Sequence, residues 1–233
     1  MTGWLDRRPV LSIGACHGQP GRVNEHHEAG LAGFLRRRTK HERAAFQLYG
    51  AAVAAARDPY LYATLGVPDT LDGRFDAVVL HVYLVVRRLN ADSVRRLPAE
   101  KTDRLPAENA GRLPAGAEPG PALAQAVFDA MFLDMDINLR EMGVSDMSVG
   151  KRNRAMWEAF HGRSAAYTAV WDDGPGLEAA FARNFWRGAK PPGDAPSAMV
   201  RLAQGQSSCL AGQTLGSMLG GSVLFLPAEE AAR

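Results

Sequence analysis

Four carboxylates crowd one segment of the sequence, where they could hold a metal ion or transfer a proton. They are Asp129, Asp134, Asp136 and Glu141. Members seven positions apart share one face of a helix, and His81 in another apolar segment could complete such a site. Carboxylate-bridged metal bundles need a Glu-x-x-His pair on each of two helices, which this sequence does not supply. We therefore predict no metal site and no catalytic residue, and we interpret the carboxylates as salt-bridge partners, as in the i,i+4 pair of Asp136 and Arg140.

A second set of polar residues lies within an apolar segment. Arg74, His81 and Arg88 are seven positions apart and share one stripe of the helix expected there. A buried histidine among valines needs a partner, because an unpaired buried polar group costs about 1–3 kcal/mol. We predict that Arg74 or His81 contacts a carboxylate of the acidic segment and forms a polar seam. In the alternative, His81 lies in an open cleft and acts with Asp134 or Asp136 in a metal- or small-molecule-dependent enzyme.

Two glycine- and serine-bearing segments near the end of the chain were weighed as sites for nucleotide binding or acyl chemistry. The glycines of 212–220 are not followed by Lys-Ser or Lys-Thr and follow no predicted strand, so they do not form a phosphate-binding loop. Residues 205–209 lack the Gly-x-Ser-x-Gly spacing of a nucleophile elbow. We therefore predict no cofactor.

Two clusters of cations are candidates for docking to a partner. They consist of Arg36, Arg37 and Arg38, and of Lys151, Arg152 and Arg154. The first cluster follows apolar residues and would give a short amphipathic piece that could touch an anionic membrane. The second opens another expected helix, where the helix dipole disfavours cations and a partner could compensate. Solvated surface is the alternative for both clusters.

Composition and length favour one globular unit. Hydrophobic residues make up 46% of the 233 residues and charged residues 22%, which is ordinary for a soluble domain with one substantial core. The net charge of +2 is too small to predict a DNA-binding protein. The start lacks the apolar core of a secretory signal, and the run 77–86 is about half of what a bilayer-spanning helix needs. With only Cys16 and Cys209, we predict a cytoplasmic protein that could also lie peripherally on the inner membrane.

Helical spacing of apolar residues predicts the elements that must carry these side chains. An alanine-rich helix ends near Arg57, and Asp58 with Pro59 has the N-cap and first-turn proline that open a short helix. Further helices are expected over 72–89, 121–142, 149–171 and 177–186, and a last one from Asp194. No alternating strand pattern appears. The predicted fold class is all-α, a single-domain array of about six or seven helices.

The valine-rich run 77–86 is the ambiguous element of this pattern. Valine favours strands, but no break interrupts 72–89, which is long for a strand and ordinary for a helix. We predict a buried helix with Asp72 as its cap.

The helical domain is expected over 31–233, with one segment before it and one within it that do not belong to its core. Residues 1–30 show no period, and we predict a poorly ordered extension. Residues 92–120 contain an Arg-Leu-Pro-Ala unit that recurs every eight residues. Its prolines prevent a continuous helix, and a surface loop tolerates added length. We predict a mobile, disordered low-complexity insertion.

Several turn and helix-start motifs are distinctive when taken together. The strings are Ala56-Arg57-Asp58-Pro59-Tyr60, Gly66-Val67-Pro68-Asp69-Thr70-Leu71-Asp72-Gly73-Arg74-Phe75-Asp76, Asp134-Met135-Asp136-Ile137-Asn138-Leu139-Arg140-Glu141-Met142-Gly143-Val144-Ser145-Asp146 and Ala159-Phe160-His161-Gly162-Arg163. With these strings, residues 49–186 outside the insertion resemble the ubiquinol–cytochrome c chaperone family.

The resemblance implies an assembly factor for the respiratory bc1 complex that binds newly made cytochrome b or an assembly intermediate and performs no catalysis. It also implies a small partner protein and the ribosome as candidate partners, beside an anionic membrane surface. The motif positions that carry over, as partner contacts or fold determinants, are Asp69, Asp72, Arg74, His81, Asp134, Asp136, Arg140, Glu141, Asp146, Lys151 and Arg163. Gly73 and Gly162 belong to the same motifs, and we predict that the fold requires both.

A chaperone of this kind is expected to expose an apolar groove to its client. Methionine adapts to varied partners, and contiguous exposed apolar surface is typical of binding sites. The methionines that could line the groove are Met131, Met135, Met142, Met147 and Met156. Packing in the core is the alternative for most of them.

Overall fold

The computed structural model describes the backbone of residues 25–94 and 119–233 and the side chains of 41–91 and 119–233. Within these ranges every regular element is helical, which confirms the all-α class. The long helices are α1 (Glu25–Ala56), α3 (Leu71–Val94), α4 (Pro119–Glu141), α5 (Asp146–Ala169) and α7 (Ala195–Ala211). The shorter ones are α2 (Pro59–Ala63), α6 (Gly174–Phe181), the π-helix η2 (Ala182–Trp186), α8 (Leu215–Leu219) and α9 (Ala228–Ala231).

The predicted extension and insertion fall mostly on residues 1–24 and 95–118, which lie outside the described part of the chain. Their borders differ from the sequence-based ones. Helix α1 already begins at Glu25, and α4 begins at Pro119. The next residue, Gly120, is buried, and a Cβ added there would lie 2.4 Å from the carbonyl oxygen of Leu89. The last residues of the predicted insertion are therefore packed against α3.

Helix α3 occupies the centre of the helical array. It packs against α1, α4, α5, α7 and η2, and the valines and leucines of 77–85 are buried on every side of the helix. A helix that is apolar all round is typical of such a central position. The prediction of a buried helix rather than a strand at 77–86 is confirmed.

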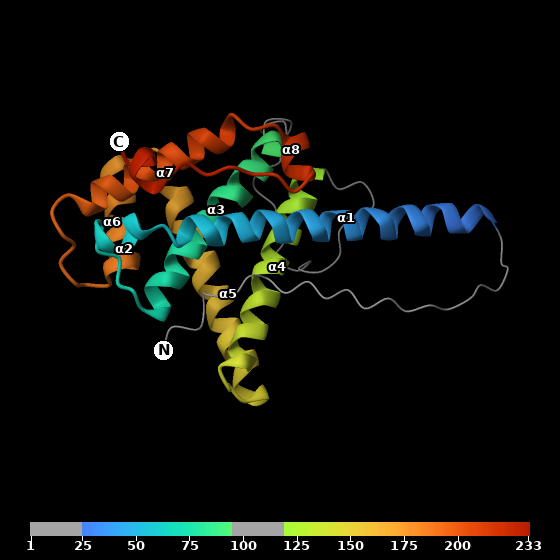
Figure 1. The fold of residues 1–233 in the computed structure, drawn as a ribbon, viewed down its shortest axis with the longest axis horizontal. Helices are drawn as coiled ribbons and strands as arrows, with labels where there is room; N and C mark the ends of the chain where they lie inside the picture. The colour runs from blue at the N-terminus through green and yellow to red at the C-terminus, as the bar shows by residue number, and fades with distance from the viewer. Residues whose placement is uncertain (1–24, 95–118) are drawn as a thin grey trace.

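Helices α1 and α4 complete the core around α3. Figure 1 shows α1 as a long rod that crosses α3 and α4, with its amino-terminal end reaching beyond the other helices. Ala45, Ala52 and Ala56 of α1 are fully buried, and such small side chains let helices approach closely. Helices α4 and α5 run antiparallel as a hairpin that projects away from α7 in the same view.

Local signals determine where the helices begin and end. The Oδ1 atom of Asp58 accepts a hydrogen bond from the Tyr60 backbone N–H at 2.9 Å, which confirms the predicted N-cap of α2. At α3, Thr70 Oγ1 accepts from the Gly73 N–H at 3.2 Å. Thr70 therefore caps α3, and the prediction of Asp72 as cap was wrong because the helix begins one residue earlier. The fold does require Gly73, since a Cβ there would lie 2.1 Å from the Pro68 carbonyl oxygen.

Candidate functional site

The tip of the α4–α5 hairpin is held together by residues that the sequence analysis selected. Arg140 donates from Nε to Asp136 Oδ2 at 2.8 Å and from Nη1 to Asp146 Oδ1. The predicted i,i+4 pair is thus confirmed and extends across the turn. Asn153 of α5 donates to the other oxygen of Asp136 at 2.8 Å. The hydrogen bond from Arg140 lowers the pKa of the Asp136 carboxyl, so Asp136 stays charged at neutral pH. Its bonds to Arg140 and Asn153 orient α5 against α4.

Exposed apolar side chains are concentrated on this hairpin. Seven large apolar side chains of the described residues are exposed, and five of them belong to α4, α5 or their connection: Leu133, Ile137, Met142, Met147 and Trp157. We call these five residues the hairpin surface. Met147 is 94% exposed, and Leu133, at 51%, is followed one turn later by Ile137. Clustered exposed apolar groups are typical of protein or membrane contact sites.

The five methionines considered for a groove divide between the core and the hairpin surface. Met131 and Met135 are buried, and Met156 is partly buried against the core. Only Met142 and Met147 are exposed, on either side of the hairpin tip. Core packing therefore holds for three of them, because the inward face of α4 lies against α1 and α3.

Cations lie beside the hairpin surface at the start of α5. Lys151 and Arg152 are exposed, and neither has an ion-pair partner within the described residues. Arg154 instead pairs with Glu158 Oε1 at 3.0 Å. Glu141 is exposed at the end of α4. The backbone of the other predicted cluster, 36–38, is part of α1, but its side chains lie outside the described ones.

Three of the predicted positions, Asp134, Arg74 and Asp69, make hydrogen bonds within the fold. The Tyr49 hydroxyl of α1 donates to Asp134 Oδ2 of α4 at 2.7 Å. Burial, and after it the charge of Asp134, raises the pKa of the Tyr49 hydroxyl. In the first turn of α3, Arg74 Nε donates to Oδ1 of Asp69, which precedes the helix, at 2.5 Å, and this hydrogen bond lowers the pKa of the Asp69 carboxyl.

His81 is buried without a carboxylate partner. Its side chain is 1% exposed, and Nδ1 donates to the Ala77 carbonyl oxygen at 2.8 Å. The ring packs edge-on against Phe225 with centroids 5.4 Å apart. Burial lowers the pKa of His81 to about 4, so the ring is neutral at neutral pH. Of the two side chains predicted to contact a carboxylate of α4, His81 does not, because a carbonyl of its own helix is the partner within reach. Arg74 pairs with Asp69, a carboxylate outside the acidic segment.

The alternative enzyme would require His81 to meet Asp134 or Asp136 in a cleft. Neither carboxylate bonds to the His81 ring: Asp134 accepts from Tyr49, and Asp136 binds Arg140 and Asn153. Within the described residues, no three His, Cys, Asp or Glu side chains are grouped so that they could hold a metal ion. The structure does not bring the proposed catalytic residues together.

Asp76, a carboxylate that the sequence analysis did not select, joins three elements. Its side chain is fully buried; Oδ1 lies 2.7 Å from Arg163 Nη2 of α5, and Oδ2 accepts from Arg187 Nη2 at 2.8 Å. Arg187 also binds Asp72 Oδ2 at 2.8 Å. Burial raises the pKa of the Asp76 carboxyl, and the two guanidinium groups oppose that rise. The predicted positions Asp72 and Arg163 therefore belong to one ion cluster around Asp76.

The sequence indicated that Asp76 needs a cation, but it did not indicate which cations would pair with it. A carboxylate at the start of an apolar, buried helix requires a cation, because an unpaired buried charge is very costly. Arg163 and Arg187 follow Asp76 at distant positions in the chain, and Arg187 adopts a left-handed backbone with φ 47° after the π-helix. Neither the distant pairing nor this conformation could be read from local spacing.

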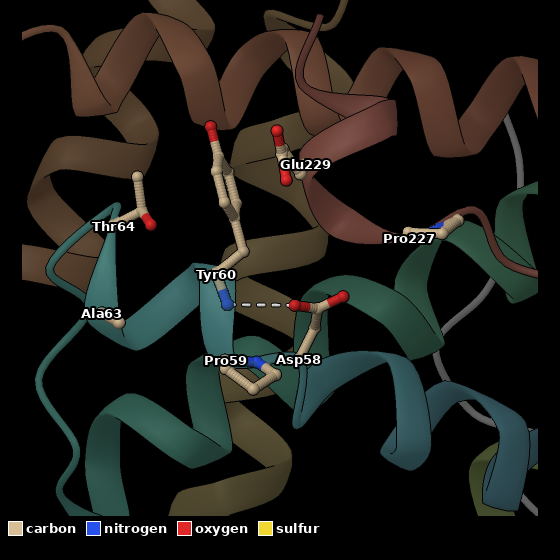
Figure 2. Close-up of a pocket in the computed structure, with 7 residues that line it drawn as sticks. All are labelled: Asp58, Pro59, Tyr60, Ala63, Thr64, Pro227 and Glu229. Atoms are coloured by element: carbon tan, nitrogen blue, oxygen red, sulfur yellow. Dashed lines mark hydrogen bonds between the residues drawn. The ribbon is translucent and has the colours of Figure 1, made fainter.

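An open cavity of ≈ 380 Å³ lies between α2 and the segment at α9 (Figure 2), and its lining residues are Asp58, Pro59, Tyr60, Ala63, Thr64, Pro227 and Glu229. Asp58 Oδ2 accepts from the Ala228 backbone N–H at 2.9 Å, while Oδ1 accepts from the Tyr60 N–H. Both oxygens of this carboxylate are thus engaged in capping the two helices. The cavity marks a structural joint at which Asp58 connects the start of α2 to the start of α9.

Comparisons with known proteins agree with the family that the motifs indicate. Residues 63–225 match the family described as Ubiquinol-cytochrome C chaperone. The chain is also similar to the crystal structure of the Cbp3 homolog from Brucella abortus, with 28% sequence identity and a TM-score of 0.65 over 86% of this chain and 98% of that chain. No curated protein matches the chain. The family match includes the hairpin and the ion cluster around Asp76.

Proposed function

The chain belongs to the ubiquinol–cytochrome c chaperone family, and from this premise we propose that it assists assembly of the bc1 complex by binding cytochrome b or an assembly intermediate that contains it. The family match over residues 63–225 carries the proposal. The similarity to the Cbp3 homolog from Brucella abortus, over nearly all of that chain, supports it.

The hairpin surface is the part of the molecule that we propose as the client contact. A membrane-protein subunit that awaits its partners presents apolar groups that water would otherwise surround. Covering them with other apolar groups is favourable by about 25 cal/mol per Å². The side chains of Leu133, Ile137, Met147 and Trp157 are free to make such contacts, and the flexible methionine can fit an irregular client.

Cations next to this surface suggest that the protein meets its client at an anionic membrane surface. Lys151 and Arg152 are exposed near the hairpin tip without ion-pair partners in the described part of the chain. An anionic membrane surface attracts such residues by about 1 kcal/mol each. None of the described helices has the length and apolar character needed to cross a bilayer. We therefore propose peripheral contact with the inner membrane through the hairpin, while the client is still in the bilayer.

The proposed function is tested in a strain that lacks the gene. The expected result is loss of the b- and c-type haem spectra of the bc1 complex, together with lower subunit levels and lower ubiquinol–cytochrome c reductase activity. Re-introduction of the gene should restore all of these. Normal bc1 levels in the deletion strain would contradict the proposal.

Variants of the hairpin test the client contact separately. In the double variant Leu133→Ser and Ile137→Ser, we expect the folded protein to persist while bc1 levels and crosslinking to cytochrome b decrease. The control is Leu224→Ser, which removes a still more exposed leucine outside the hairpin. Equal effects of the two changes, or no effect of the double variant, would show that the client is bound elsewhere.

A further inference from the structure

A second open cavity, of ≈ 280 Å³, lies between α5 and η2. Its lining residues are Ala159, Gly162, Arg163 and Ala166 of α5, with Arg183 and Asn184 of η2. Apart from Arg163, α5 contributes only alanine and glycine to this cavity. The α5 wall of the cavity therefore carries one large side chain, Arg163, and the η2 wall carries a second arginine, Arg183.

Packing does not explain the glycine at position 162. A Cβ added there meets nothing within 4 Å, and a glycine inside a helix is less stable than an alanine. The prediction that the fold requires Gly162 was therefore wrong, in contrast to Gly73. Since Gly162 lines the cavity, a side chain at this position would occupy space within it. The glycine keeps that space open.

The charged groups around the cavity leave an excess of positive charge. Among the described residues, the charged side chains that line it are Arg163 and Arg183. The ion cluster to which Arg163 belongs, with Arg187, Asp72 and Asp76, has two cations and two anions, so Arg183 supplies the excess positive charge. Arg183 is exposed and has no ion-pair partner within the described residues. The Nε atom of Arg163 is buried, and no acceptor for it occurs in the same part of the chain.

The wall that bears Arg183 has an uncommon backbone. Single π-helical turns are rare and occur frequently at functional sites. Here η2 ends at Arg187 in the left-handed region, which residues other than glycine seldom adopt. This conformation commits Arg187 to Asp72 and Asp76. Arg183, one turn earlier, forms no ion pair with the described residues of that cluster.

We propose that this cavity binds a phosphate group between Arg183 on one wall and Arg163 on the other. Guanidinium groups form strong, charge-assisted hydrogen bonds to phosphate oxygens. Donors from two different helices can reach separate oxygens of a tetrahedral oxyanion, which has more acceptor directions than a planar carboxylate. The phosphate comes either from a free anion or from the headgroup of an anionic phospholipid, since both present unesterified, negatively charged phosphate oxygens. The site is separate from the hairpin surface and does not depend on the proposed function.

Binding is measured on the full-length protein with three probes. Inorganic phosphate and acetate are titrated calorimetrically at matched ionic strength, and phosphatidylcholine vesicles with and without phosphatidylglycerol are tested by co-sedimentation. We expect the wild type to bind phosphate or the phosphatidylglycerol vesicles. Arg183→Gln and Gly162→Leu should weaken that binding at least tenfold. Lys190→Gln, which removes an exposed cation outside the cavity, should leave it unchanged.

The outcomes distinguish the source of the phosphate from failure of the site. Binding of inorganic phosphate identifies a free anion. Binding of the phosphatidylglycerol vesicles alone identifies a lipid headgroup in the cavity if Arg183→Gln weakens it, whereas vesicle binding that is unchanged in this variant belongs to the cations beside the hairpin surface. The proposal is overturned if neither binds, if acetate binds as well as phosphate, or if Arg183→Gln binds like the wild type. Cooperative unfolding of each variant verifies that it folds. Gly162→Ala provides a smaller change at the same position should the leucine variant not fold.

Discussion

The carboxylate of Asp76 and the guanidinium of Arg163 form a buried ion pair with 2.7 Å between Oδ1 and Nη2. This pair connects the central helix α3 to α5, and Arg187 extends it to the segment after η2. A buried ion pair adds little net stability, because both charges lose their hydration. Removal of one partner is costly, because the other is left buried and unpaired.

We therefore expect Asp76→Ala to lower the free energy of unfolding by about 3–5 kcal/mol. Asp69→Ala breaks an ion pair as well, that with Arg74, but at an exposed site, and should cost less than about 1 kcal/mol. Urea denaturation of both variants measures the difference. Similar, small losses for the two would mean that the Asp76 cluster does not hold α3 and α5 together.

Asp58 caps two helices, because its carboxylate accepts hydrogen bonds from the backbone N–H groups of Tyr60 in α2 and of Ala228 in α9. Ala228 lies 170 positions after Asp58 in the sequence. Asp58→Ala removes both bonds and should lower the free energy of unfolding by about 2 kcal/mol. The control is Asp173→Ala: Asp173 precedes α6 at the N-cap position but makes no side-chain capping bond. An equal loss of stability in both variants, measured by thermal and urea unfolding, would refute the double cap.

The buried His81 should make the fold sensitive to mild acid. Its pKa is about 4 in the folded chain and 6.5 for an ordinary histidine, so the unfolded chain binds more protons between these values. Stability contributed by neutral His81 is complete above pH 6.5 and decreases as the pH falls toward 4. The loss amounts to about 3 kcal/mol and levels off below pH 4.

The measurement is the difference in unfolding free energy between wild type and His81→Leu from pH 7.5 to 4. We expect the leucine variant to fold, because an apolar side chain can replace a buried polar one, and to lack this part of the pH dependence. His81→Ala should also lack it but be less stable, because of the cavity it leaves. Parallel pH profiles for wild type and His81→Leu would show that His81 is not the group that titrates.

Two glycines of the family motifs should respond to alanine in opposite directions. Gly162→Ala should raise the free energy of unfolding by about 0.5–1 kcal/mol, because alanine is the better helix former and nothing obstructs its Cβ. Gly73→Ala should be destabilising, because its Cβ would collide with the Pro68 carbonyl oxygen. Thermal unfolding of both variants without added ligand measures the direction of each stability change. Destabilisation by Gly162→Ala would show that the fold requires Gly162 for packing.

The elements of this protein were predictable wherever neighbouring residues decide them. Asp58 and Pro59 open α2, and a helix follows from the unbroken length of the valine-rich run, because caps and periodicity act within a few residues. The pair of Asp136 and Arg140 was predictable for the same reason, since residues four apart on a helix meet. The borders were less certain: α3 began one residue before the predicted cap.

What the sequence determined by itself is therefore the all-α class, most helix positions and, through its turn motifs, the family. The tertiary structure alone decided the partners of the buried polar groups. Asp76 meets Arg163 and Arg187, Tyr49 meets Asp134, and His81 turns to its own backbone. Such pairs depend on how helices distant in sequence are placed beside each other, and a polar group that is being buried bonds to whichever donor or acceptor that placement brings within about 3 Å.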